Sequence, residues 1–509
     1  MNHLIILPIL LPLLSALFLM LPPLSGSIVR QRTGSLVSLT LLLGISLLLL
    51  NEAHTGTITL YSLGDWAPPF GILLVADRLS ALMLVLSAIL GLATSLYASA
   101  DDDTRGRFFH SLMQFQLMGI NGAFLTGDLF NLFVFFEVLL IASYALVIHG
   151  GGKQKTRANI HYVTLNLFGS SIFLFALGTL YGTLGTLNMA DMARKVALLP
   201  AADSPLVEVG ALLLFVVFAL KAAAFPLYFW LPTTYSAVAA PVAALFAIMS
   251  KVGIYALLRV FSLVFGTQAG ELAHLAVPWL WPMAIATIGL GALGVLASQD
   301  LRGQAAYLVI ISVGTLLAGL ALNHAAGTTA LLFYLVHTTL VSAGLFLLVD
   351  LIARQRGHAH SRIVSGQPPL QRQLLGVLFI VATLAMIGMP PFSGFLGKVL
   401  MLQATTPGTA RLWLWPALLL SSLVLILVFS RTGSTVFWRT SGGQSKAEPA
   451  HPAQLAATLI LLAAAPLLSL FAGPMTNYAE ATAAQLHHPE LLMHAIFPDS
   501  LPPTHGGQP

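Results

Sequence analysis

Long apolar runs recur along nearly the whole chain and are separated by short polar segments. Each run has about 20 residues, which is enough for an α-helix to cross a hydrocarbon core about 30 Å thick. A transmembrane barrel would need runs of about ten residues with alternating polarity. The pattern therefore predicts an all-α polytopic membrane protein.

The runs divide into about fourteen predicted spans, with ends placed to within several residues. The first run lacks a basic start and a small-residue cleavage site, so we interpret it as a retained span rather than a signal peptide. The predicted spans are residues 3–22, 34–52, 76–99, 107–125, 127–148, 159–182, 205–231, 236–263, 274–297, 303–323, 327–353, 373–403, 411–437 and 455–475.

Three segments between or after the spans have their own patterns. Residues 57–75 begin with alternating polarity and contain Pro68 and Pro69, which favours an external hairpin or loop. Residues 188–197 are typical of a short surface helix, and residues 476–509 of a polar tail with a poorly ordered end.

The distribution of basic residues predicts the orientation. Loops after odd-numbered spans, with the adjoining span ends, hold fifteen cations: Arg30, Arg32, Arg105, Arg107, Lys153, Lys155, Arg157, Arg302, Arg354, Arg356, Arg362, Arg372, Arg431, Arg439 and Lys446. The even-numbered loops hold five: Arg78, Arg194, Lys195, Arg259 and Arg411. Since cytoplasmic loops carry the excess of Lys and Arg, both termini are predicted to lie outside.

Composition excludes several classes of protein. Only 8% of the residues are charged, against about 25% in soluble domains. The absence of cysteine excludes disulfides, thiolate metal sites and cysteine nucleophiles. The net charge of +5 is spread over short loops and forms no basic patch, so nucleic acid is not an expected partner.

One acidic residue, Glu137, lies near the middle of a span. An ionised side chain at the bilayer centre costs about 2.5–3.5 kcal/mol on insertion scales, so something must compensate it. One reading is a structural ion pair that locks helices together. The other is a titrating site on an ion pathway, which such residues mark by default.

The seventh predicted span combines a lysine with two prolines. Pro226 has no N–H to donate four residues back, which frees the carbonyl of Ala222 beside Lys221. Pro232 closes the same stretch. We therefore expect a broken helix here, and broken helices at membrane depth line cavities or are buried in protein.

The twelfth predicted span repeats this arrangement. Pro390 and Pro391 precede Lys398, with several glycines between them. Interrupted spans in corresponding positions of two halves are typical of transporters built from inverted repeats. The pattern favours repeats that cover the fourth to eighth and the ninth to thirteenth spans.

Two more titratable residues lie within spans. Lys251 is far from both ends of the eighth span, which argues against snorkelling of its amine to the interface. His337 in the eleventh span carries an imidazole, which titrates near neutral pH. A membrane histidine is as often a hydrogen-bonded packing residue, so both roles stay open.

Searches for other chemistry are negative. The sequence has no Walker loop, dinucleotide fingerprint, convincing haem-ligating pair or zinc-spaced cluster, so we expect neither a cofactor nor a metal site. One carboxylate within the spans is also too few oxygens for a complete cation cage.

Three stretches carry a family resemblance: Phe225–Pro232, Ser250–Arg259 and Pro390–Lys398. They resemble the antiporter-like membrane subunits shared by multisubunit Mrp-type Na⁺/H⁺ antiporters, respiratory complex I and membrane-bound hydrogenases. The resemblance covers nearly the whole chain. The second stretch, together with Tyr228 and Tyr235, is most similar to the D subunits of Mrp-type antiporters.

The resemblance implies a fourteen-helix fold with two inverted five-helix repeats and breaks in the seventh and twelfth helices. It divides the chain into a three-helix segment (1–106), a first repeat (107–263), a second repeat (274–437), a fourteenth helix (455–475) and the tail (476–509).

The resemblance also implies roles for matching residues. Glu137 would pair electrostatically with Lys221, Lys251 would connect half-channels, and Lys398 would exchange protons with one side. Complex I relatives often carry a lysine where this chain has Val341, and an Asp where it has Thr233. Both departures make a complex I subunit a less favoured reading. The valine at position 341 also leaves His337 as the expected proton carrier of the eleventh span.

Three hypotheses follow. The first is a proton-translocating subunit of a monovalent cation (Na⁺ or K⁺)/proton antiporter in a bacterial inner membrane, assembled with other antiporter subunits. The second is a proton-pumping subunit of complex I or a hydrogenase. The third is a scaffold subunit whose buried charges only hold helices together.

Overall fold

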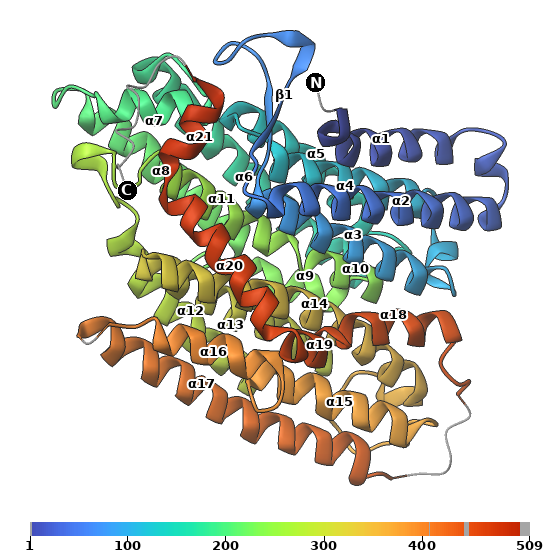
Figure 1. The fold of residues 1–509 in the computed structure, drawn as a ribbon. Helices are drawn as coiled ribbons and strands as arrows, with labels where there is room; N and C mark the ends of the chain where they lie inside the picture. The colour runs from blue at the N-terminus through green and yellow to red at the C-terminus, as the bar shows by residue number, and fades with distance from the viewer. Residues whose placement is uncertain (1–2, 407, 442–446, 499–509) are drawn as a thin grey trace.

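A computed structural model describes residues 3–406, 408–441 and 447–498. Lys446 and the end of the predicted tail lie outside these ranges. The described chain is a bundle of helices with one small hairpin (Figure 1). The fold is therefore all-α, as the apolar pattern predicts.

Twelve helical segments in the described ranges are long and apolar enough to cross a membrane. The predicted spans at 107–125 and 373–403 correspond to a 17-residue helix, α4, and to an interrupted pair, α15 and α16. The total of fourteen spans stays a prediction. The first half contains α1 (Leu7–Met20), α2 (Ile28–His54), α3 (Arg78–Ala98), α4 (Phe109–Leu125), α5 (Leu129–Val147), α6 (Lys153–Leu184), α7 (Met189–Ala197), α8 (Ser204–Ala222), α9 (Trp230–Ala237), α10 (Ala240–Phe246) and α11 (Met249–Leu263).

The second half ends in helices that the sequence pattern did not predict. Its elements are α12 (Val277–Ala297), α13 (Leu301–Leu322), α14 (Ala325–Gln355), α15 (Arg372–Ile387), α16 (Ser393–Gln403), α17 (Thr409–Gly433) with a π-helical turn η7 (Ser434–Trp438), α18 (Pro452–Leu462), α19 (Ala464–Leu470), α20 (Ala472–His487) and α21 (Pro489–Ile496). Most of the described part of the predicted tail is thus helical, and α20 packs against α14.

Both predicted helix breaks are present. The seventh span stops with α8 at Ala222 and resumes with α9 at Trp230, so Pro226 lies in the gap and Pro232 in the first turn of α9. The twelfth span stops with α15 at Ile387 and resumes at Ser393, with Pro390 and Pro391 between. A third break, at residues 247–248 between α10 and α11, was not predicted.

The segments between spans also have defined structure. Strands β1 (Thr59–Ser62) and β2 (Leu73–Ala76) form the predicted hairpin, with Thr59 opposite Ala76. The predicted short helix at 188–197 is α7, and one side of it is buried. Asn188 caps its first turn by accepting hydrogen bonds from two backbone N–H groups.

One series of helices crosses the whole bundle. The helices α5, α6, α8, α11, α13, α14, α16 and α17 each pack against the next in this order. The series begins with the teal helix α5 and ends with the orange helix α17 (Figure 1). Every residue of the apolar window of α14 is buried, so this helix lies in the interior of the bundle.

Candidate functional site

The first cluster on this series surrounds Lys221, near the end of α8. The Lys221 amine is buried and donates a hydrogen bond to Asn166 Oδ1 at 3.2 Å. It also lies 5.9 Å from the centre of the Phe136 ring, which is within the range of a cation–π contact. The ammonium thus meets an amide oxygen and an aromatic face.

Glu137 reaches this cluster through α6. Its carboxylate accepts a hydrogen bond from Ser170, whose hydroxyl also donates to the backbone carbonyl of Asn166 at 3.0 Å. Among the described residues, no ion pair within 4.0 Å joins Glu137 to Lys221. Asn166 and Ser170, one helical turn apart, therefore bridge the two charged groups.

The break after α8 is held by specific contacts. Ala223 ends the helix in the left-handed conformation. The carbonyl of Leu220 accepts from the N–H of Ala223 and from the indole N–H of Trp230, both at 3.1 Å. The N–H of Phe225 donates a hydrogen bond to the Thr287 hydroxyl at 3.0 Å. The interruption at Lys221 is therefore a defined structure with satisfied polar groups.

Gly253 brings α11 against this break. A Cβ atom at this position would lie 2.5 Å from the backbone nitrogen of Ala222. Only glycine permits this approach, because the opposing atoms belong to the backbone and cannot rotate away. Gly253 thus sets the spacing between the helix of Lys221 and the helix of Lys251.

Lys251 is fully buried near the start of α11, directly after the unpredicted break. Its amine lies 3.5 Å from the Ser312 hydroxyl on α13. The Tyr235 hydroxyl donates to the carbonyl of Phe246 at 2.6 Å, at the end of α10. Tyr235 therefore satisfies backbone polarity at a break where no proline stands.

His337 is fully buried on α14, and its Nδ1 lies 2.8 Å from the Ser393 hydroxyl at the start of α16. Gly394 follows Ser393. A Cβ at that position would lie 1.9 Å from the carbonyl oxygen of Ala385 and 2.8 Å from His337 Nε2. The absence of a side chain at Gly394 thus leaves room for the imidazole of His337 beside the break.

Lys398 on α16 points back into the same break. Its amine donates to the carbonyl of Ile387, at the end of α15, and to the Ser422 hydroxyl on α17, both at 2.7 Å. Gly388 has φ +84°, and a Cβ there would lie 2.8 Å from the lysine side chain. This second break therefore binds its lysine through a freed carbonyl, whereas the Lys221 amine uses an amide side chain.

The five predicted residues lie on helices that contact one another in sequence. Glu137 is on α5, Lys221 on α8, Lys251 on α11, His337 on α14 and Lys398 on α16, with α6 and α13 interposed. The same helices carry further buried polar side chains, among them Thr315 on α13 and Thr338 on α14. We call the five residues and their polar partners on this series of helices the polar line.

Five uncharged partners on this line were not identified from the sequence: Asn166, Ser170, Ser312, Ser393 and Ser422. Serine and asparagine are tolerated in membrane helices because they bond to the backbone or across a helix interface. Asn166 and Ser170 do stand at the i, i+4 spacing that places two side chains on one helix face. That spacing is the feature of the sequence that could have identified these two residues as a pair.

A second buried charge cluster lies at the head of α3. Arg259, which the sequence pattern placed among the loop and span-end cations, lies within α11, and its guanidinium binds both carboxylate oxygens of Asp77, at 2.5 and 2.8 Å. It also donates to the Tyr255 hydroxyl, which donates to the carbonyl of Phe124 at 2.6 Å. Asp77 also caps α3. These contacts tie α3, α4 and α11 together.

A third cluster lies in the loop between α3 and α4. Asp102 accepts a hydrogen bond from Arg354 at 2.7 Å. Burial, together with the negative charge of Asp350, raises the pKa of the Asp102 carboxyl to about 6. Burial acts in the same direction on Asp103, but hydrogen bonds from Arg32 and His110 prevail and lower its pKa to about 2.

Residues suited to hold a metal do not gather anywhere in the described ranges. No group of three or more His, Asp or Glu side chains has the required geometry there. The candidate site consists of one carboxylate, three amines and an imidazole, which can exchange protons, together with hydroxyls and an amide that hydrogen-bond to them.

These features define a class, namely polytopic helical membrane subunits that hold a line of ionisable side chains inside the bilayer. The chain belongs to the NADH:quinone oxidoreductase/Mrp antiporter family of membrane subunits, whose model matches residues 126–426. The matched region contains all five predicted site residues.

Two relatives match almost end to end. The D subunit of a probable K⁺/H⁺ antiporter from Rhizobium meliloti is 40% identical over 97% of this chain and 98% of its own length. The D subunit of the Na⁺/H⁺ antiporter from Bacillus subtilis is 36% identical over 98% of this chain and 100% of its own. These relatives are antiporter subunits, which are transporters rather than enzymes.

Solved structures share the fold. A chain of the Mrp complex from Dietzia sp. DQ12-45-1b has a TM-score of 0.87 and 26% identity, covering 97% of this chain and 100% of its own. A chain of respiratory complex I from Thermus thermophilus has a TM-score of 0.78 and 25% identity, covering 95% and 99%. The resemblance inferred from the sequence is confirmed.

Proposed function

We propose that this chain is a proton-translocating subunit of a multisubunit monovalent cation/proton antiporter. The observation that carries the proposal is the line from Glu137 to Lys398, in which each ionisable group has a polar partner on a neighbouring helix. Desolvated charges are costly unless they are compensated. The presence of five ionisable groups along one series of packed helices favours proton movement over a purely structural use.

Each residue has a proposed part. Glu137, through Ser170 and Asn166, influences the protonation of Lys221 in the first break. Lys251 connects the two halves of the bundle across α13. His337 passes the proton to the second break, where Lys398 exchanges it with one side of the membrane. The transported cation is Na⁺ or K⁺, since both occur in the names of the relatives.

The proposal includes the setting of the chain. The matched solved structures are multisubunit membrane assemblies, which supports partner subunits of the same kind here. We place the chain in a bacterial inner membrane with both termini outside, on the distribution of basic loops. We also propose that residues 107–263 and 274–437 are the two inverted repeats.

A proton-pumping subunit of a redox complex is the second candidate, supported by the likeness to complex I. It is less favoured because the D subunits of cation/proton antiporters match at higher identity. The composition of the purified complex separates the two, since a redox complex contains flavin and iron–sulfur subunits.

The direct test is reconstitution of the affinity-purified complex into vesicles that contain a pH-sensitive dye. Addition of Na⁺ or K⁺ outside should move protons out of vesicles that hold the whole complex. The chain alone should move few or none, because one carboxylate within its spans offers too few oxygens for a cation site. Robust exchange by the isolated chain would refute the proposal that partner subunits are needed for cation transport.

A further inference from the structure

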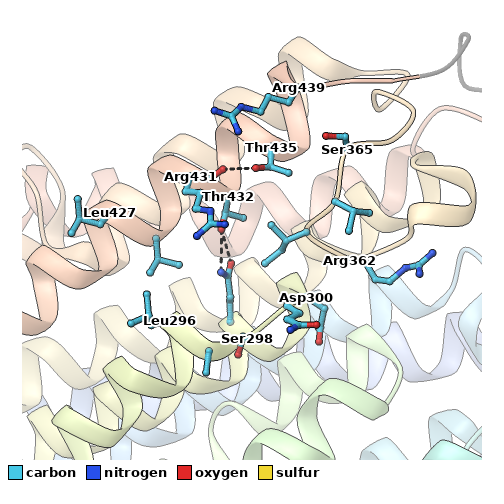
Figure 2. A pocket seen from close by; sticks show the side chains of 16 residues that line it. Leu296, Ser298, Asp300, Arg362, Ser365, Leu427, Arg431, Thr432, Thr435 and Arg439 are labelled. Atoms are coloured by element: carbon cyan, nitrogen blue, oxygen red, sulfur yellow. Dashed lines mark hydrogen bonds between the residues drawn. The ribbon is translucent and has the colours of Figure 1, made fainter.

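A large cavity on the described surface lies away from the five residues of the polar line. It has a volume of about 1100 Å³ and lies between the C-terminal ends of α12 and α17, beside the loop that follows α14. Figure 2 shows its walls, with Leu296 and Leu427 at one side and Arg362 and Ser365 at the other. The cavity thus sits where two apolar spans end.

The polar wall of this cavity is basic. Arg362, Arg431 and Arg439 line it, and Arg431 points from α17 into the cavity (Figure 2). Within the described ranges none of these three arginines forms an ion pair. The one carboxylate in the lining, Asp300, is engaged in capping α13 through the N–H of Gly303 at 2.8 Å. With three arginines against one carboxylate, the lining carries a net positive charge.

The floor of the cavity is polar but already satisfied. Gln304 is buried, and its amide exchanges hydrogen bonds with the Thr432 hydroxyl at 3.1 and 3.3 Å, as the dashed lines in Figure 2 show. The Thr435 hydroxyl donates to the carbonyl of Arg431. Of the three guanidinium groups, that of Arg362 donates to the carbonyl of His358 at 2.7 Å and keeps further N–H groups. A ligand would therefore meet guanidinium groups rather than the floor.

An apolar surface continues from the cavity along the bundle. Leu293 and Leu296 on α12 and Leu423 and Leu427 on α17 are each at least half exposed. At the other end of the same two helices lies an apolar groove of about 550 Å³ that includes Trp281 and Trp413. Tryptophans are enriched at membrane–water interfaces, so the two cavities mark the two ends of one lipid-facing seam.

We propose that the cavity at Arg362, Arg431 and Arg439 binds the phosphate headgroup of an anionic phospholipid, with its acyl chains lying along the leucines of α12 and α17. Guanidinium groups bind phosphate oxygens in a bidentate manner. Basic pockets between membrane helices on the cytoplasmic side bind anionic headgroups, and the three arginines belong to the loops and span ends predicted to be cytoplasmic. The adjoining exposed leucines distinguish a lipid from a free phosphate ion, which would use the charge alone.

The chain has no cysteine, which allows a single reporter to be introduced. Leu293→Cys lies close to the cavity without lining it and is labelled with bimane in the full-length chain. The labelled protein is placed in phosphatidylcholine vesicles that contain a small fraction of brominated phosphatidylglycerol, which quenches a dye in contact with it. We expect quenching well above that given by the same fraction of brominated phosphatidylcholine.

Replacing Arg362, Arg431 and Arg439 with Gln should remove this preference. Each arginine near an anionic surface contributes a factor of about five in affinity, so the triple variant should lose on the order of 100-fold. Arg157→Gln is the matched control, because Arg157 is exposed at another loop predicted to be on the same side. The melting temperature of each variant in detergent checks that it is folded.

Three outcomes would overturn the proposal. Equal quenching by the two brominated lipids would mean that the headgroup charge is not recognised. An absence of quenching would mean that a protein surface, rather than a lipid, covers the seam. Loss of the preference when inorganic phosphate is added would identify a free anion as the ligand.

Discussion

Each buried lysine on the polar line keeps its amine beside oxygen atoms that carry no full charge. Lys221 uses an amide, Lys251 a hydroxyl, and Lys398 a carbonyl with a hydroxyl. Such oxygen atoms accept a hydrogen bond from the amine without holding it in its charged form. A carboxylate in direct contact would hold it charged. The residues therefore suit proton exchange better than a permanent ion pair.

Lys221→Ala should abolish cation/proton exchange while the protein stays in the membrane. The change removes a titrating group, and it breaks no ion pair among the described residues. The measurement is dye-reported proton flux in vesicles, with protein quantified by immunoblot. Lys153→Ala, at the exposed start of α6, is the control and should exchange normally. Near-normal flux in Lys221→Ala would remove this residue from the pathway.

Glu137 and Lys221 should behave as a coupled pair even though an amide and a hydroxyl separate them. In a double-mutant cycle of Glu137→Gln and Lys221→Ala, the two losses of activity should be strongly non-additive, with a coupling of about 0.5–3 kcal/mol. Glu137→Asp should do less harm because the charge is kept.

Asn166, which lies between Glu137 and Lys221, provides the control for this double-mutant cycle. Asn166→Ala removes the acceptor of the Lys221 amine, so repeating the cycle in that background should shrink the coupling. Losses that simply add in the wild-type background would place the two residues on independent tasks.

The charged residues of the site could be predicted from the sequence because an amine or a carboxylate within an apolar span is rare and costly. Glu137, Lys221, Lys251 and Lys398 all stood out for this reason. Asn166, Ser170 and Ser312 did not, because uncharged polar residues occur throughout the predicted spans. Only their partners in space distinguish them.

At the scale of helices, the approach of α11 to the end of α8 depends on a missing side chain. Gly253→Ala would place a Cβ 2.5 Å from the backbone of Ala222. Overpacking of this kind costs about 1–3 kcal/mol. We expect a lower melting temperature in detergent together with reduced exchange, because the helices of Lys221 and Lys251 are pushed apart.

Gly289→Ala on α12 is the matched control, since a Cβ there meets no atom within 4 Å. That variant should be as stable as the wild type or slightly more stable, because alanine is the better helix former. If both glycine variants had the same melting temperature, the close approach at Gly253 would not contribute to stability.

The helix breaks show what a sequence pattern can and cannot predict about elements. Proline marks the breaks in the seventh and twelfth spans, because its missing N–H is visible in the sequence. The break before Lys251 contains no proline and depends on a hydroxyl from Tyr235, eleven residues before the carbonyl that it binds. The helices α20 and α21 were missed because their polar residues bond to distant parts of the chain.

At the scale of the whole molecule, a reporter fused to the C-terminus should face the periplasm. A truncation fusion that ends at Gly357, just after Gln355, should face the cytoplasm. The fifteen-to-five split of basic residues is the basis of this prediction. Paired alkaline phosphatase and green fluorescent protein fusions measure it, and the reverse pattern would show that the spans are miscounted.

The loop between α3 and α4 should make stability depend on pH. Because the folded-state pKa of Asp102 is raised from 3.8 to about 6, the folded protein binds this proton more tightly than the unfolded chain does. The stabilisation is fully present below the unfolded pKa and is lost as pH rises through 6. Between pH 5 and pH 7.5 the loss amounts to about 1.4 kcal/mol.

Asp102→Asn removes this group, so its melting temperature should fall less than that of the wild type between the same two pH values. Other titrating groups are common to both proteins and cancel in the comparison. Identical pH dependence in the two proteins would mean that Asp102 does not titrate in this range.

The helix α20 crosses the bundle diagonally and ends beside the start of α3 (Figure 1). Tyr478 donates to the carbonyl of Arg78 across 400 residues of sequence, and Gln485 accepts from the N–H of Arg78 across 407. A ribosome adds about 5–20 residues per second. The start of α3 is therefore made about 20–80 s before its last contacts exist, and for that interval the nascent chain is an open assembly in the membrane that only its final helices close.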